Sequence, residues 1–320
     1  MDIATIAIVF GVICLTWSAD QFVVGAIVVA QYWKVSPMLI GLTVVSLGTS
    51  APEIWVSVMA VTQGHVAIAV GNAIGSNITN IGLVLGVTTL IAPLTIKKSI
   101  ACREIPWLVL VTIIVGGCLL NLYLGLIDSL MLLGLLLITL YLMFWWQKKH
   151  SEEPLEEPLE EAGKVPRLST AAALFKLSGG LVVLLISSKA LIWGAVQVAE
   201  FMGISDLVIG LTVIAIGTSL PELAASIMSV IRHQHDIALG NIVGSNIFNL
   251  LAVLAVPGLL APGKIDSSVI SRDYPIMLGL TLLLAAFAIG KQSKSIGRLA
   301  GLMFLLSYCF YSVWLYMGYI

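Results

Sequence analysis

The chain has 320 residues, of which 59% are hydrophobic and only 10% are charged, and its mean hydropathy is +1.06. Soluble domains carry about 25% charged residues, so this composition excludes an ordinary soluble protein and predicts an integral membrane protein. The net charge of −1 gives no reason to expect a nucleic-acid partner. The four cysteines are scattered and lack the paired spacing of a metal–thiolate site.

Long apolar runs follow one another along the chain. Each is roughly 20 residues or longer, which is the length that a helix needs to cross a ~30 Å hydrocarbon core. The runs do not alternate in polarity as the strands of a membrane barrel do. We therefore expect an all-α integral membrane protein whose ten transmembrane helices lie at residues 3–31, 37–62, 66–91, 104–121, 124–146, 170–200, 206–231, 236–260, 273–290 and 297–318.

One hydrophilic segment, residues 147–169, separates the fifth span from the sixth. It contains the acidic repeat EEPLEEPLEE, a composition typical of a solvated, disordered linker; a strip that senses Ca²⁺ is the alternative. We divide the chain at this segment into a first half, residues 1–146, an acidic cytoplasmic linker, and a second half, residues 170–320.

Two stretches of the chain are nearly the same sequence. Residues 41–87 and 210–256 align without a gap, and about half of their positions are identical. The first contains GLTVVSLGTSAPE and GNAIGSNITN, and the second contains GLTVIAIGTSLPE and GNIVGSNIFN. Because each half has five spans, an odd number, the second half enters the membrane from the opposite side. This is an inverted-topology repeat, an architecture of transporters whose substrate site lies near the bilayer midplane.

The positions of Lys and Arg predict the orientation of the chain. With the N-terminus outside, only Lys264 and Arg272 lie at outer connections, and twelve basic residues lie at cytoplasmic loops or ends: Lys34, Lys97, Lys98, Arg103, Lys148, Lys149, Lys164, Arg167, Arg232, Lys291, Lys294 and Arg298. Cytoplasmic loops carry an excess of Lys and Arg. We therefore expect both termini to lie outside a bacterial inner membrane that the chain crosses many times.

Glu53 and Glu222 occupy the same position in the two repeats. A charged side chain near the centre of a bilayer costs about 2.5–3.5 kcal/mol on insertion scales. Neither repeat motif contains a basic partner, and an unpaired buried carboxylate is strongly destabilising. The two glutamates are therefore expected to bind a cation.

Hydroxyl groups and a proline accompany each glutamate. Thr49 and Glu53 share a helix face, and Pro52 lacks a backbone N–H and disturbs the preceding turn, so we expect a kink between Gly48 and Glu53. Hydroxyls, carboxylates and freed carbonyls form an oxygen-only ligand set, which suits Na⁺ and Ca²⁺. The hydroxyl residues of this set are Thr49, Ser50, Thr218 and Ser219. For the two threonines, a hydrogen bond to their own helix backbone is the alternative.

The following span of each repeat carries a polar stripe. Its members recur at every fourth residue: Asn72, Ser76 and Asn80 in the first repeat, and Asn241, Ser245 and Asn249 in the second. We expect Asn72 and Asn241 to support the broken backbone of the neighbouring span. For Asn77 and Asn246, an interhelical hydrogen bond and ligation of the cation are equally good interpretations. Glycines at 71, 75, 240 and 244 have the spacing that lets helices approach closely.

Asp20 and Lys189 also occupy matching positions, in the first and sixth spans. They are expected to form a midplane ion pair or to face water near a gate.

The paired motifs resemble the two α-repeats of the Ca²⁺/cation antiporter superfamily, and most of all its bacterial and archaeal sodium/calcium exchanger branch. The resemblance covers essentially the whole chain. It implies that Ca²⁺ and Na⁺ compete for overlapping sites and move by alternating access. It also implies a ligand set of Glu53, Glu222, Thr49, Thr218, Ser76, Ser245 and Asn80, with the backbone carbonyls of Ser46 and Ala215.

One position departs from the pattern of that family. Some of its members carry Asp at the position of Asn249, which we include among the expected site residues together with Ser50 and Ser219. With Asn at both Asn80 and Asn249, the formal charge of the site is −2, which matches one Ca²⁺.

The sequence therefore predicts a secondary active antiporter that exchanges Ca²⁺ for Na⁺, for Ca²⁺ extrusion, without a cofactor. Exchange of Ca²⁺ for H⁺ is the alternative. An intramembrane acid protease fits less well, because repeat symmetry supplies ion ligands more naturally than an acid–base pair. Channels usually gather their ligands by oligomeric symmetry around a pore, whereas this chain builds its symmetry internally.

Overall fold

The computed structural model describes residues 2–150, 168–204, 213, 215–289 and 295–317. In the first half, the elements are α1 (Asp2–Trp33), α2 (Pro37–Ile40), the π-helical η1 (Gly41–Val45), α3 (Ser46–Thr49), α4 (Ala51–Thr62), α5 (Val66–Thr79), the π-helical η2 (Asn80–Leu85), α6 (Gly86–Ile91), β1 (Leu94–Thr95), α7 (Lys98–Cys102), α8 (Glu104–Leu119), β2 (Tyr123–Leu124) and α9 (Leu126–His150).

The second half repeats this order. Its elements are α10 (Thr170–Phe201), α12 (Ala215–Thr218), α13 (Leu220–Ile231), α14 (His235–Phe248), the π-helical η4 (Asn249–Val253), α15 (Ala255–Leu260), β3 (Gly263–Lys264), the π-helical η5 (Val269–Asp273), α16 (Tyr274–Ile289), β4 (Ser295–Ile296) and α17 (Arg298–Met317).

Within the described residues, nine helical segments are long and apolar enough to cross a membrane. They coincide with nine of the ten expected spans. The remaining expected span, residues 206–231, lies partly outside the described residues, and its described part comprises α12 and the short apolar helix α13. The expected linker, residues 147–169, lies largely outside them too, although α9 continues to His150.

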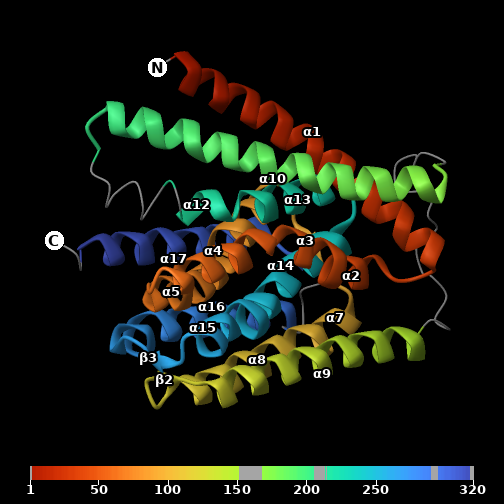
Figure 1. Ribbon diagram of the computed structural model, residues 1–320. Coiled ribbons are helices and arrows are strands. Elements are labelled where there is room, and N and C mark those ends of the chain that lie inside the picture. The colour runs from red at the N-terminus through yellow and green to blue at the C-terminus, as the bar shows by residue number, and fades with distance from the viewer. Residues whose placement is uncertain (1, 151–167, 205–212, 214, 290–294, 318–320) are drawn as a thin grey trace.

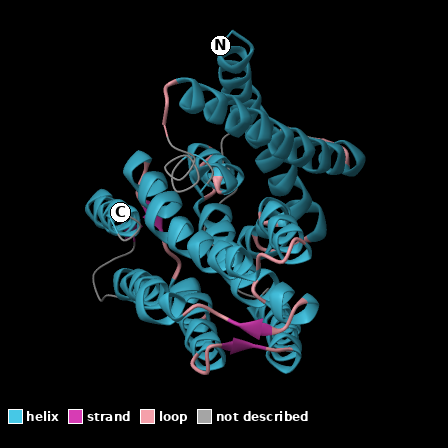
Figure 2. Cartoon of the chain, turned by 60° about the vertical axis from the view of Figure 1, so that its left-hand side comes forward, coloured by secondary structure: helices cyan, strands magenta, loops and turns pink. Residues whose placement is uncertain are grey.

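Two short antiparallel ladders join the halves and demonstrate their inversion. β1 pairs with β4, and β2 pairs with β3, in two separate places in Figure 2. β1 and β3 follow the third and eighth spans and are equivalent positions of the two repeats. Equivalent positions therefore take part in different ladders, each of which is completed by the other half, as two halves of opposite orientation require.

The long helices α1 and α10 lie side by side along one flank of the molecule (Figure 1). Glycines allow the two backbones to touch: a Cβ on Gly25 would lie 2.5 Å from the amide nitrogen of Leu177, and one on Gly180 would lie 2.6 Å from that of Phe22. The two helices run antiparallel, since Gly11 meets Leu191 near their other ends. Their shared apolar core is separate from the main core of the molecule.

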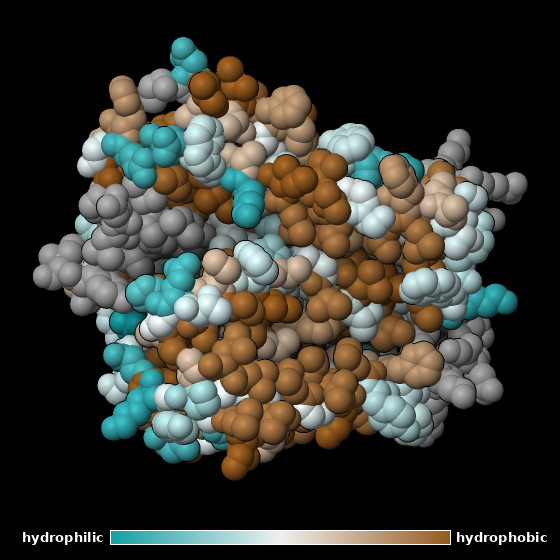
Figure 3. Space-filling view, in the orientation of Figure 1, coloured by the Kyte–Doolittle hydropathy of each residue, from teal (hydrophilic) through white to brown (hydrophobic). Residues whose placement is uncertain are grey.

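The main core forms around the segments that contain the polar stripes. In the most apolar part of His235–Leu260, 89% of the residues are buried, compared with 28% for the first span. The stripe-bearing helices are therefore central and the flanking helices peripheral. On the face in Figure 3, hydrophobic side chains fill the middle and hydrophilic ones gather mainly towards the left margin, as expected for a surface that faces lipid between two aqueous phases.

Candidate cation site

Each glutamate follows a break between two helices. α3 ends and α4 begins around Ser50, whose backbone angles are φ −84° and ψ 3°; α12 ends and α13 begins around Ser219, at φ −90° and ψ 7°. Neither residue has helical ψ. The break lies directly before Pro52 and Pro221, whose rings leave the preceding turn without one backbone donor. The kink that we predicted between Gly48 and Glu53 is therefore present, with its equivalent in the second repeat.

The polar stripes end in π-helical turns, which sequence analysis missed. Asn80 is the first residue of η2 and Asn249 the first of η4, and the backbone N–H of Leu254 donates to the Asn249 carbonyl at 3.0 Å. A π-helical turn inserts an extra residue and occurs often at functional sites. No residue type signals it, but its occurrence at equivalent positions in both repeats indicates a shared requirement.

Close packing places α14, which carries the polar stripe of the second repeat, against η1 and α3, which precede the helix break of the first repeat. A Cβ on Gly244 would lie 2.4 Å from the Ser46 hydroxyl oxygen and 2.6 Å from the Leu42 carbonyl, so only glycine fits there. The packing role predicted for Gly240 and Gly244 is confirmed. Around Gly71 and Gly75, a Cβ would meet nothing within 4 Å in the described part of the chain.

Hydrogen bonds cross between the repeats at the glutamates. The Ser50 hydroxyl donates to Glu222 Oε1 at 3.2 Å, and the Thr49 hydroxyl donates to Asn241 Oδ1 at 3.2 Å. The Thr49 hydroxyl also lies within donating distance of the Ser46 carbonyl, at 3.4 Å. This is the hydrogen bond to its own helix backbone that sequence analysis gave as the alternative. The two motifs, 169 residues apart, therefore meet in one place.

Each asparagine at the start of a stripe holds the glutamate of its own repeat. Asn72 Nδ2 donates to the Glu53 carbonyl at 3.0 Å and to the Ser57 hydroxyl at 3.2 Å. Asn241 Nδ2 makes the equivalent contacts to the Glu222 carbonyl at 3.2 Å and to the Ser226 hydroxyl at 3.0 Å. Sequence analysis missed the two serines, although both lie four residues after a glutamate in the repeated segment.

The expected site residues are almost all buried. Glu53 and Glu222 are each 1% exposed, and Thr218 is half-buried. Ala215 belongs to α12, and the Ser46 carbonyl accepts from the Ser50 backbone N–H at 2.9 Å. The other expected residues with buried side chains are Ser46, Thr49, Ser50, Ser76, Asn80, Ser219, Ser245 and Asn249.

Many of the buried polar atoms have no hydrogen-bond partner among the described residues. In the repeat motifs they are Glu53 Oε2, Glu222 Oε2, Asn80 Oδ1, Asn249 Oδ1 and Nδ2, Ser219 Oγ, Ser245 Oγ, and both polar side-chain atoms of Asn77; outside the motifs, Thr88 Oγ1, Glu104 Oε2 and Ser129 Oγ are also without a partner. A buried polar atom without a partner loses about 1–3 kcal/mol of solvation. Most of the atoms in the motifs are oxygens, so a cation would satisfy them.

Basic residues do not neutralise the glutamates. None of the ion pairs among the described residues includes Glu53 or Glu222. The described residues also contain no group of three or more His, Cys, Asp or Glu side chains that could hold a metal. The site thus offers two carboxylates and several neutral oxygens, a set that suits hard cations such as Na⁺ and Ca²⁺ rather than a thiolate- or imidazole-bound metal.

Of the two roles expected for Asp20 and Lys189, the ion pair between them is not formed. Asp20 Oδ1 accepts from Arg232 Nε at 2.7 Å, which joins α1 to the end of α13. Lys189 is exposed and takes part in none of the ion pairs of the described residues. The twinned positions therefore do not meet: Asp20 lies beside the contact of Phe22 with Gly180, and Lys189 lies beside the contact of Leu191 with Gly11, at a different height along the antiparallel pair.

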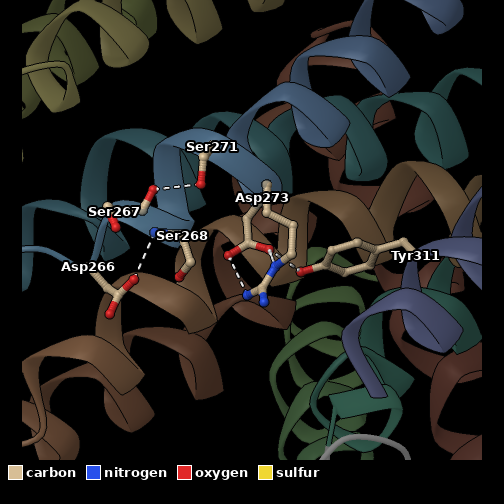
Figure 4. Close-up of polar contacts among 7 residues, drawn as sticks. Asp266, Ser267, Ser268, Ser271, Asp273 and Tyr311 are labelled. Atoms are coloured by element: carbon tan, nitrogen blue, oxygen red, sulfur yellow. Dashed lines mark hydrogen bonds and ion pairs between the residues drawn. The ribbon is translucent and has the colours of Figure 1, made fainter. Parts of the chain in front are cut away.

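A second polar cluster lies where η5 continues into α16 (Figure 4). Asp273 accepts from Arg272 Nε at 2.7 Å and from the Tyr311 hydroxyl at 3.0 Å. Nearby, Asp266 accepts from the Ser268 backbone N–H at 2.7 Å. These protein donors occupy both oxygens of the Asp273 carboxylate, and the Tyr311 contact fastens η5 to α17.

Comparison with known proteins supports the same architecture. The Sodium/calcium exchanger protein family model matches residues 3–147 and 172–317. The CaxA protein of Alkalimonas amylolytica is 45% identical over 99% of each chain. The inner membrane protein YrbG of Escherichia coli is 36% identical over 95% of this chain and 94% of its own. The sodium–calcium exchanger NCX_Mj, soaked with Na⁺ and Ca²⁺, superposes with a TM-score of 0.82 at 34% identity over 96% of each chain.

Proposed function

The chain belongs to the sodium/calcium exchanger protein family, and from that premise we propose that this membrane antiporter exchanges Ca²⁺ for Na⁺ by alternating access. Its relatives are transporters and not enzymes. The observation that carries the proposal is the buried pair Glu53 and Glu222, one from each repeat, without a basic partner among the described residues.

We assign the ligands from both repeats. The two glutamates provide the charge, and neutral oxygens complete the coordination of an ion that takes six to eight of them. The neutral ligands in this proposal are the side chains of Thr49, Ser50, Ser76, Asn80, Thr218, Ser219, Ser245 and Asn249 and the carbonyls of Ser46 and Ala215.

Charge balance accounts for competition between the ions. Two carboxylates carry a charge of −2, which one Ca²⁺ or two Na⁺ neutralise. A buried charge without a counterion is unfavourable. The site therefore favours binding of one Ca²⁺ or of two Na⁺ over binding of both kinds of ion at the same time. Entry of Na⁺ therefore promotes release of Ca²⁺, which is the coupling that an exchanger needs.

The proposal includes direction and location. Both termini lie outside, the linker 147–169 lies in the cytoplasm, and the protein extrudes Ca²⁺ across a bacterial inner membrane. The distribution of Lys and Arg supports this orientation, and the Escherichia coli relative is named an inner membrane protein, which agrees with the location.

Ion flux in proteoliposomes tests the proposal. We expect liposomes loaded with Na⁺ to take up radiolabelled Ca²⁺ when external Na⁺ is absent, and liposomes loaded with K⁺ or choline at the same pH to take up none. Liposomes that contain Glu222→Gln provide the background. Uptake that follows an imposed pH gradient and ignores Na⁺ would make H⁺ the coupling ion and would refute the Na⁺ assignment.

A further inference from the structure

We propose that Asn72 and Asn241 are positioning residues of the cation site: their amides hold the ligand glutamates through the glutamates' backbone carbonyls and do not contact the ion. This inference rests on the proposed function, because it takes Glu53 and Glu222 as ligands of the transported ions.

The contacts occur twice, in two halves of opposite orientation. In each repeat the asparagine Nδ2 lies within 3.2 Å of the glutamate carbonyl and of the hydroxyl of the serine four residues later. In the first repeat these links join α5 to α4, and in the second they join α14 to α13. Equal contacts at equivalent positions indicate a requirement of the site and not an accident of local packing.

The helix breaks explain why such a link is needed. Glu53 lies in the first turn of α4, just after the break at Ser50, and Glu222 lies in the first turn of α13, just after the break at Ser219. A continuous helix would fix the height and rotation of each glutamate through its preceding turn. Across a break that constraint is weaker, so a donor from the neighbouring helix is needed to fix the glutamate backbone.

The chemistry of the contact selects an amide. A side-chain NH₂ group has two hydrogens, one for the carbonyl and one for the serine hydroxyl. A carboxylate has none, and a Ser or Thr hydroxyl has one. Among short side chains, only Asn makes both contacts without bringing a further charge to the two glutamates.

Asn241 adds a link across the site. Its Oδ1 accepts from the Thr49 hydroxyl of the first repeat while its Nδ2 donates to the Glu222 carbonyl of the second. One buried amide thus sets the separation between two proposed ligands on opposite sides of the pseudo-two-fold axis. Groups that orient metal ligands commonly change metal affinity about 10- to 100-fold when they are removed.

Asn246 supplies a matched control on the same helix. It is buried like Asn241, but its amide donates to the Ile242 carbonyl of its own helix at 2.7 Å. Asn246→Ala and Asn241→Ala remove the same atoms from α14. The two variants differ in whether the lost amide reaches a glutamate.

The experiment is calorimetric titration of the purified full chain with Ca²⁺ and with Sr²⁺ in Na⁺-free detergent. For Asn241→Ala we expect the Kd for Ca²⁺ to rise about 10- to 100-fold and the Ca²⁺/Sr²⁺ affinity ratio to move towards one. A loosened ligand set distinguishes ions of different radius less sharply. Asn246→Ala should leave both the Kd and the ratio at their wild-type values. A purely structural role would reduce the fraction of folded protein without changing the ratio.

Ser226 keeps the inference testable if Asn241→Ala does not fold. Ser226→Ala leaves one amide hydrogen without its acceptor, so we expect a smaller shift of the ratio in the same direction. If the double variant Asn241→Ala/Ser226→Ala folds, its change in Ca²⁺ binding free energy should be less than the sum of the two single changes, since both substitutions act through one contact. The inference would be overturned if Ser226→Ala kept the wild-type Ca²⁺/Sr²⁺ affinity ratio and if Asn72→Ala folded and bound Ca²⁺ with the wild-type Kd.

The outcomes separate this inference from the proposed function. If the wild-type chain binds no Ca²⁺, the proposed function fails and this inference fails with it. If the wild-type chain binds Ca²⁺ but Asn241→Ala keeps its Kd and its ratio, only the positioning role is refuted.

Discussion

Glu53 and Glu222 are each 1% exposed, and both have one carboxylate oxygen without a partner among the described residues. Ser50 of the first repeat donates to the carboxylate of the second, so the glutamates share one environment. Two buried negative charges without a counterion would oppose folding. At the scale of single residues, the simplest account is that the oxygens around them are arranged for a cation.

Neutralising either glutamate should abolish exchange. Glu53→Gln and Glu222→Gln remove half of the formal charge and almost no volume, so we expect folded protein and a loss of Na⁺-dependent Ca²⁺ flux of at least about 100-fold, equivalent to about 2.7 kcal/mol. Flux in proteoliposomes measures this. Glu200→Gln, at an exposed position of α10, is the control and should transport like the wild type. Near-normal flux in either site variant would contradict the ligand assignment.

A charge added at Asn249 should tighten binding. Both polar atoms of the Asn249 side chain are buried without a partner among the described residues. Asn249→Asp changes the site from −2 to −3, so we expect a lower Kd for Ca²⁺ and slower exchange, because tighter binding of the ground state opposes release. Calorimetry and flux on the same preparation check the two effects. An unchanged Kd would place Asn249 outside the coordination sphere.

At the scale of elements, irregular helices position these residues. The breaks at Ser50 and Ser219 separate short helices from the glutamate-bearing ones, and η2 and η4 begin at the last asparagine of each stripe. Irregular backbone at membrane depth is tolerated where the protein buries it. The two π-helical turns lie in the two most buried segments, and Ser50 and Ser219 at the breaks are themselves buried, as that condition requires.

The contact at Gly244 should be intolerant of a methyl group. Gly244→Ala places a Cβ 2.4 Å from the Ser46 hydroxyl, and overpacking of this kind destabilises by about 1–3 kcal/mol. We expect a lower thermal unfolding temperature and weaker Ca²⁺ binding. Gly279→Ala, whose Cβ would meet nothing within 4 Å of the described residues, should be neutral or stabilising by up to about 1 kcal/mol. Equal unfolding temperatures for the two variants would be inconsistent with the close approach.

At the scale of the whole molecule, the inverted halves meet at the site and at both ladders. The first ladder requires that β1 and β4 lie on the same side of the membrane. The second ladder makes the same requirement of β2 and β3. The distribution of Lys and Arg then chooses which side is cytoplasmic.

Cysteine labelling tests the orientation. In a background without the native cysteines, we expect single cysteines at the exposed positions Gln63 and Lys264 to react with an impermeant reagent from outside. Cysteines at Lys98 and Arg298, which are also exposed, should react only after permeabilisation. The reverse pattern would overturn the outward assignment of the termini, and a mixed pattern within either pair would contradict the inverted repeat.

The Asp20–Arg232 pair connects the α1–α10 flank to the rest of the molecule. Asp20→Asn should lower stability by no more than about 1 kcal/mol, because both side chains are partly exposed and such pairs are weak. Thermal unfolding at low salt should reveal the loss, and high salt should reduce it. Lys189→Gln should have no effect at either salt concentration. A loss that is independent of salt would indicate packing rather than an ion pair.

The sequence by itself determined the class of the protein, the approximate limits of the spans, the repeat and the glutamate pair. Each of these depends on local composition, periodicity or identity between two segments. The kink before Glu53 was predictable too, because Pro52 acts on its own turn regardless of the rest of the fold.

Only the tertiary structure decided which groups meet. One role that the sequence suggested for Asp20 and Lys189 was an ion pair between them, but Asp20 pairs with Arg232. Asp20 lies beside the contact of Phe22 with Gly180, whereas Lys189 lies beside the contact of Leu191 with Gly11, so the two residues are at different heights along the antiparallel helix pair. The hydrogen bond from Thr49 to Asn241 and the π-helical turns at Asn80 and Asn249 were likewise not readable from the residues. They depend on how two distant segments pack around shared buried oxygens, a long-range property that no local pattern encodes.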